Sequence, residues 1–253
     1  MPTRSGRRFA SIAVAMLICT GLGLASPSAR ADACPAPEGA PAVARIDSQA
    51  RKEFLAHAFE REVEDIDAWS WTWGSVYSAG AITQGVALTQ TVNPGNRTDL
   101  TVGVISTAFG ASSLTLLPLQ LTVPLRSARR HINDPDTCAS LARAERTLVS
   151  VEKDQALANG ILAHIGNVAV NAGIALILGL GYDRWKSAAI SGGVGVAIGE
   201  ANAFTQPHHL REVLERYRSG HLDVPPLPES SIAWSIVPVA TPQMSGAAIV
   251  GSW

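Results

Sequence analysis

The sequence predicts an all-α fold made of a duplicated unit, in which an amphipathic helix is followed by an apolar helical hairpin. Glycines recur every three or four residues from Ser187 to Pro207, which clears one helix face for a close neighbour. The earlier segment from Arg97 to Pro118 repeats this pattern at an offset of 89 residues. Two copies predict four apolar helices in a pseudo-symmetric membrane bundle, with residues 51–130 superposing on 143–218. The helix-packing glycines would be Gly103, Gly110, Gly192, Gly195 and Gly199, and Pro118 matches Pro207.

The N-terminus predicts a secretory signal peptide over residues 1–31. Arginines at positions 4, 7 and 8 precede an apolar run, and Ala29-Arg30-Ala31 fits a cleavage site. Its removal leaves acidic residues in excess of basic ones, which argues against nucleic acid as a partner. Charged residues make up only 16% of the chain, against about 25% in an ordinary soluble domain. This deficit favours a membrane protein or extensively buried helices.

Two cysteines, Cys34 and Cys138, follow the signal peptide. In an oxidising compartment an even number of cysteines indicates a disulfide. We therefore expect a bridge with its Cα atoms about 4.4–6.8 Å apart. Two unpaired thiols are the alternative.

We expect an irregular lead-in over residues 32–43 and the first unit over residues 44–133. Its amphipathic helix precedes Trp69 to Val92, an uncharged run long enough to span a bilayer core of about 30 Å. The tryptophans that open this run are typical of an interfacial aromatic belt, or of aromatics packed on a partner helix. A turn at Asn93 to Asn96 leads into the first glycine helix, which we expect Pro118 and Pro124 to close.

We expect the second unit over residues 134–222. An amphipathic helix over Cys138 to Ala158 precedes an apolar run from Ile161 to Tyr182 and then the second glycine helix. After Pro207 comes a short amphipathic helix that we expect Gly220 to end. Residues 223–253 predict a proline-rich linker and then either a short β-hairpin or a loose tail.

The second hairpin carries polar residues that the first lacks. His164, Asn167 and Asn171 share one helix face, and Glu200 and Asn202 lie near the far end of the partner helix. An antiparallel hairpin would bring His164 beside Glu200. Two interpretations stay open: a pairing that fixes helix register, or a functional site for a proton or ion step.

The sequence predicts an exported integral membrane protein of the bacterial cell envelope with a structural or interaction role. Its expected partners are membrane lipid and a second copy or another envelope protein. We predict no enzyme activity, catalytic residue, metal site or cofactor, because no such motif is present. One alternative is a soluble periplasmic or secreted helical bundle that acts as a binding module, which the short fourth apolar helix favours. A second is a small channel or transporter that uses His164 and Glu200.

Overall fold

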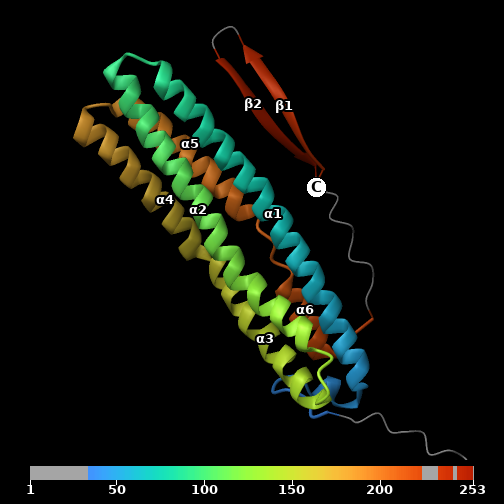
Figure 1. Ribbon diagram of the computed structural model, residues 1–253. Helices are drawn as coiled ribbons and strands as arrows, with labels where there is room; N and C mark the ends of the chain where they lie inside the picture. The colour runs from blue at the N-terminus through green and yellow to red at the C-terminus, as the bar shows by residue number, and fades with distance from the viewer. Residues whose placement is uncertain (1–33, 224–232, 242–243, 253) are drawn as a thin grey trace, which may run out of the picture. The chain divides into compact units, whose positions relative to one another are not determined.

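The computed structural model describes residues 34–223, 233–241 and 244–252, so the predicted signal peptide lies outside the described residues. The fold is α-helical, as the sequence predicts, with a 3-10 turn at Pro41–Arg45 and six α-helices before the C-terminal strands. Two of the helices are long, and four shorter ones follow them (Figure 1).

The first unit is one antiparallel pair, α1 (Ser48–Gln90) and α2 (Pro94–His131). Asp47 caps α1 by accepting from the backbone N–H of Gln49 at 2.6 Å. Both helices run without a break, so the prediction of separate amphipathic and apolar helices is wrong here. Trp69 and Trp73 are buried against Leu114, which continues the packed face of α1 through the expected boundary.

The prediction that Pro118 and Pro124 close the first glycine helix is also wrong, because both lie inside α2. A proline inside a helix costs about 3 kcal/mol or more. Leu121 and Leu125 on the same helix, and its C-cap residue Ile132, are each at most 2% exposed. Burial of that face beyond the prolines offsets their local cost.

The second unit has the same order of segments, but both of its long helices are interrupted. Residues 159–160 separate α3 (Thr137–Ala158) from α4 (Ile161–Leu176), which ends in a π-helical turn, η2 (Ile177–Gly181). Residues 205–209 separate α5 (Trp185–Phe204) from α6 (Leu210–Ser219). Gly220 ends α6 in the left-handed conformation, as predicted, although the helix begins at Leu210 rather than at Pro207. The superposition of the two units stays a prediction.

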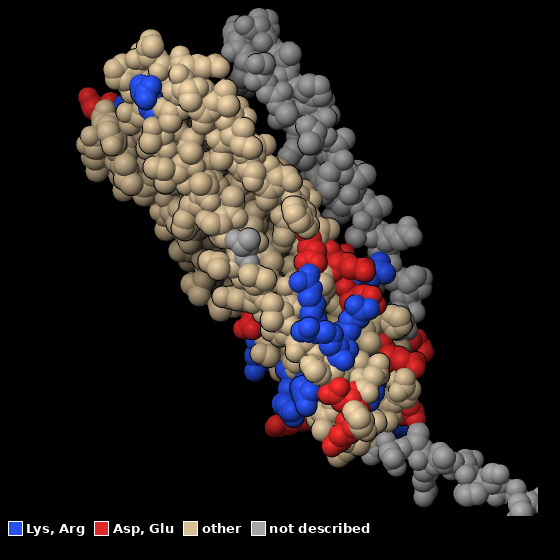
Figure 2. Space-filling model, in the orientation of Figure 1, with Lys and Arg blue, Asp and Glu red and all other residues tan. Residues whose placement is uncertain are grey.

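The core lies at the end of the molecule that carries most of the charges. We call residues 34–67, 126–154 and 211–223 the head, and residues 68–125 and 155–210 the apolar half. In the head, α1, α2, α3 and α6 bury one cluster of apolar side chains that includes Phe59, Ala128, Leu148 and Leu214. Figure 2 shows Lys, Arg, Asp and Glu gathered over this end, whereas on the face shown the apolar half carries them only at its tip. The predicted Cys34–Cys138 disulfide is confirmed, with the Cα atoms 5.2 Å apart.

The C-terminal residues form two antiparallel strands, β1 (Ala233–Thr241) and β2 (Met244–Ser252). Their register runs from the pair Ala233 and Ser252 to the pair Thr241 and Met244.

Candidate functional site

A chain of hydrogen-bonded polar side chains runs between α4 and α5. His164 Nδ1 lies 2.6 Å from Glu200 Oε2, and Asn167 Nδ2 donates to Glu200 Oε1 at 2.8 Å. Asn171 Nδ2 donates in turn to Asn167 Oδ1 at 2.8 Å. We call these four residues the polar seam. The seam follows α4 for seven residues, or about 10 Å of helix.

The polar seam is partly open to its surroundings. The side chains of His164 and Glu200 are 26% and 24% exposed, and the His164 ring lies against Phe204 at a centroid distance of 5.1 Å. The fifth predicted member, Asn202, is not part of the seam. Its backbone oxygen accepts from Trp69 Nε1 at 3.3 Å, so it belongs to a contact between α1 and α5.

The glycines of α5 provide the space that the seam occupies. A Cβ atom at Gly199 would collide with Asn167 Oδ1, and one at Gly195 would collide with Asn171 Oδ1. At Gly192 a Cβ would lie 3.1 Å from Ala175 Cβ and 3.6 Å from the Asn171 backbone oxygen. We expected these glycines to allow contact between two backbones. Instead, two of the three accommodate asparagine side chains, and only Gly192 faces a neighbouring backbone.

The glycines of α2 accommodate side chains in the same way, but the side chains differ. A Cβ at Gly103 would collide with the Gln84 side chain, and one at Gly110 would lie 2.6 Å from the Tyr77 ring. The two glycines and the two side chains are each seven residues apart, which is two helical turns. The first hairpin therefore repeats the packing of the second without its ionisable pair.

The two hairpins are joined at both ends of the apolar half. Near the head, Trp73 Nε1 donates to Thr205 Oγ1 at 2.9 Å, beside the Trp69 contact. At the turns, Arg184 donates to both carboxylate oxygens of Asp99, at 2.7 and 2.6 Å, and Ser187 Oγ donates to Asp99 Oδ2 at 2.8 Å. The sequence pattern alone did not predict this pair. Its signal was the few charges at the turns of otherwise uncharged runs: Arg97 and Asp99 at the first, and Asp183, Arg184 and Lys186 at the second.

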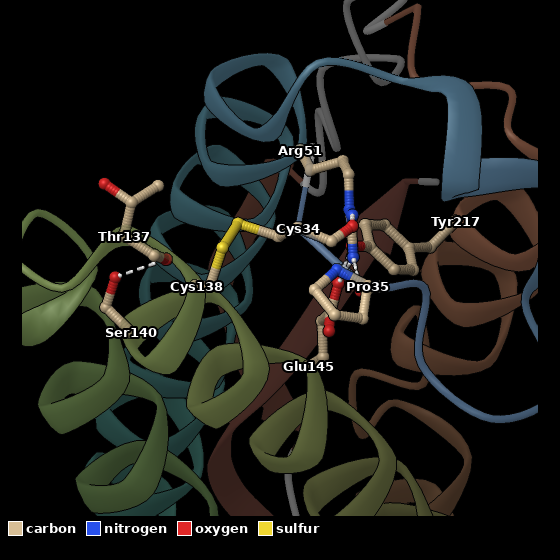
Figure 3. Close-up of polar contacts among 8 residues, drawn as sticks. All are labelled: Cys34, Pro35, Arg51, Thr137, Cys138, Ser140, Glu145 and Tyr217. Carbon is tan, nitrogen blue, oxygen red and sulfur yellow. Dashed lines mark hydrogen bonds and ion pairs between the residues drawn. A yellow bond between two sulfur atoms is a disulfide. The ribbon is translucent and has the colours of Figure 1, made fainter. Parts of the chain in front are cut away.

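A buried ionic cluster in the head was also missed (Figure 3). Arg51 Nε donates to the Tyr217 hydroxyl at 3.0 Å, and Arg51 Nη1 donates to the Cys34 backbone oxygen at 2.9 Å. Glu145 Oε1 accepts from both Arg51 Nη2 and the Tyr217 hydroxyl. Burial raises the pKa of Tyr217 above its ordinary value, and Glu145 raises it further. The cluster ties the lead-in, α1, α3 and α6 together beside the disulfide, which indicates a structural role.

Over the described part of the chain, no three His, Cys, Asp or Glu side chains are grouped closely enough to hold a metal ion. No protein family model, curated protein or solved structure matches the chain.

Proposed function

We propose that the protein is an integral membrane protein of the cell envelope, with its apolar half in the bilayer and its head on the exported side. The observation that carries this proposal is the exposure of the apolar half. Large apolar side chains stand uncovered on all four of its helices, among them Ile82, Ile105, Phe109, Leu162 and Ile190. No residue of α4, which the structure describes throughout, is buried. Exposing such a surface to water costs about 25 cal/mol per Å².

The length of the apolar half fits a bilayer. Two helical stretches, Pro94–His131 and Thr137–Gly181, are long and apolar enough to cross a membrane, and the second includes the interruption at residues 159–160. α5 has 20 residues, or about 30 Å at 1.5 Å per residue, which equals the thickness of a typical hydrocarbon core. The sequence predicted a short fourth apolar helix, which favoured the soluble alternative, and the 20 residues of α5 weaken that argument.

Exposed aromatic side chains lie at both ends of the apolar half. Trp71 and Phe204 are 77% and 73% exposed near the head, and Tyr182 and Trp185 are 56% and 54% exposed near the turns. Trp and Tyr are enriched at the two interfaces of a bilayer, because each ring has an apolar body and a polar edge. Of the tryptophans that open the uncharged run, Trp71 therefore supports the belt interpretation, while Trp69 and Trp73 pack inside.

The exposed surface favours a membrane protein over the soluble alternative. A soluble helical bundle buries one face of each helix, and α4 has no such face. The disulfide in the head supports an oxidising location for that end. Since the glycine faces are filled from within the chain, we propose that they assemble the two hairpins, and that lipid or another envelope protein contacts the outer surface.

Alkaline carbonate extraction of membranes from cells that make the full chain tests this proposal. We expect the protein to stay with the membrane pellet, and release into the supernatant would contradict it. Ile82→Asp places a charge on the outer surface of the apolar half and should reduce retention. Ser150→Asp, at an exposed position of the head, is the matched control and should not.

A second candidate function is a proton or ion step at the polar seam. The specific observation is the contact of His164 with Glu200 inside an otherwise apolar helix pair, because ionisable groups within membrane helices are rare and costly. Purified protein in vesicles loaded with a pH-sensitive dye would report proton flux. A flux that falls in Glu200→Gln but not in Ser191→Ala would support this function, and no flux above empty vesicles would exclude it.

A further inference from the structure

The two helix interruptions of the second unit lie against each other. Asn159 Nδ2, in the first, donates to the backbone oxygen of Pro207, in the second, at 3.3 Å. The backbone N–H of Leu210, the first residue of α6, donates to Gln155 Oε1 in the last turn of α3 at 3.2 Å. We call residues 159–160 and 205–209 the paired breaks. α1 and α2 are continuous at the corresponding positions.

One amide side chain connects the paired breaks to α1. While Gln155 Oε1 accepts from Leu210, Gln155 Nε2 donates to Glu62 Oε1. Glu62 and Gln155 are 2% and 3% exposed. The contact from Glu62 through Gln155 to Leu210 is therefore buried and joins three helices.

The surroundings of Glu62 favour its neutral form. Burial raises the pKa of Glu62 to about 7, the hydrogen bond from Gln155 opposes this rise, and the nearby Asp65 carboxylate adds to it. Burial raises the pKa of Asp65, and the charges of His209 in the second break and of Arg61 on α1 oppose this rise. From α3 and α6, the groups that meet the Glu62 carboxyl are the neutral Gln155 amide and, through it, a backbone N–H. Within the described ranges, a charge on Glu62 would thus have one hydrogen-bond donor, Gln155, and a like-charged neighbour, Asp65.

Two buried polar atoms in and beside the paired breaks are unsatisfied. Asn159 Oδ1, in the first break, and Asn202 Nδ2, in the last turn of α5 just before the second, have no hydrogen-bond partner among the described residues. A buried polar atom without a partner is unfavourable, and exposure to water would relieve it. Opening of the breaks to water would therefore be favourable for these two atoms.

We propose that the paired breaks are a hinge between the head and the α4–α5 hairpin, held closed by the Glu62–Gln155–Leu210 contact and opened when Glu62 loses its proton. A rise in pH through neutrality would then loosen the second hairpin from α1, while the continuous α1 and α2 stay fixed to the head. The inference does not depend on the membrane proposal, because every residue of the contact lies in or beside the head.

Double electron–electron resonance on the purified protein in detergent tests the hinge. Nitroxide labels go on Glu64→Cys in α1 and Leu162→Cys in α4, two exposed positions, while the native cysteines are bonded to each other. We expect one distance population at pH 5.5 and a second one at pH 8.5, with a midpoint near 7. A distribution that does not change with pH would overturn the proposal.

Two variants locate the effect. Glu62→Gln, which mimics the protonated carboxyl, should keep the pH 5.5 distribution at both pH values. Gln155→Ala should show the second population even at pH 5.5, because it removes the contact itself. Asp65→Asn is the control and should keep a transition. A transition that persists in Glu62→Gln, or a Gln155→Ala protein that stays closed at pH 5.5, would contradict the assignment to this contact.

Discussion

Asp99 and Arg184 join the turns of the two apolar hairpins through two hydrogen bonds, at 2.7 and 2.6 Å. The pair connects α2 to the residue that precedes α5, 85 positions further along the chain. Two parallel bonds of this kind fix direction as well as distance, which an ordinary surface ion pair does not. The turns of the two hairpins are thus held in one orientation.

Asp99→Asn should lower the melting temperature by about 2–4 °C and speed hydrogen exchange at both turns, because Arg184 loses its charged partner. Thermal unfolding and exchange mass spectrometry would measure the two effects. Asp183→Asn, at the acid next to Arg184 in the turn of the second hairpin, is the control and should leave both unchanged. Equal behaviour of the two variants would mean that the pair does not hold the hairpins together.

Gly199→Leu should destabilise the protein by about 1–3 kcal/mol, because the new side chain collides with Asn167. Gly193→Leu is a close control on the same helix, since a Cβ there has open space around it. Unfolding in denaturing detergent would compare them. If Gly199→Leu unfolds like the wild type, α4 and α5 do not pack through this face.

Glu145→Ala should destabilise the head by about 3–5 kcal/mol, because it leaves Arg51 buried without its carboxylate. Arg51→Met combined with Glu145→Leu should recover part of this loss, since no buried charge remains. Arg143→Ala is the matched control: Arg143 sits at the position that the repeat aligns with Arg51, yet its side chain is 53% exposed. Urea unfolding followed by circular dichroism would rank the variants. A Glu145→Ala cost no larger than that of Arg143→Ala would show that the cluster is dispensable.

Replacing both Cys34 and Cys138 by Ser should lower stability, by about 4–5 kcal/mol if chain entropy dominates. The bridge closes a loop of 104 residues, and long loops gain most from closure. Melting curves with and without reductant would give the effect, and mass analysis of the non-reduced chain would verify the bond. If reductant breaks the bond in the wild-type protein without lowering its melting temperature, this expectation is wrong.

Stability should fall as pH rises from about 4.5 through 7, because Glu62 binds its proton more tightly in the folded chain than in the unfolded one. The neutral Glu62 carboxyl contributes its full stabilisation at pH values below its pKa in the unfolded chain. This contribution is lost as the pH rises through its pKa in the folded chain. The shift corresponds to about 3 kcal/mol across that window. Chemical unfolding at several pH values should show this slope in wild type and in Glu64→Gln, an exposed control. The slope should be largely absent in Glu62→Gln.

The sequence predicted the helices and their order, but not which of them are continuous. Pro118 and Pro124 are local stop signals, and they are overruled by burial of Leu121 and Leu125, which depends on α3 and α6. Conversely, residues 205–209 contain a single proline, and there the chain does leave the helix. Local helix propensity cannot predict which of these prolines ends a helix, because the deciding contacts come from segments far away in the sequence.

The sequence predicted part of the candidate site. Helical spacing and the antiparallel turn place His164 opposite Glu200, and the structure brings them together, although their role stays a prediction. Asn202 was assigned to the same group because it is two residues from Glu200, a separation that on a helix points to a different face. Two other features depend on the register between helices: the asparagines that fill the glycine face, and the contact between Asp99 and Arg184. Periodicity within one helix does not predict that register.

The disulfide has a consequence for proteolysis. Cys34 precedes α1 and Cys138 lies in the first turn of α3, so the bond encloses the whole first hairpin. A single cut at the exposed turn between α1 and α2 would leave two fragments that remain one covalent molecule. Such a nicked chain would migrate as intact protein until a reductant separated its pieces.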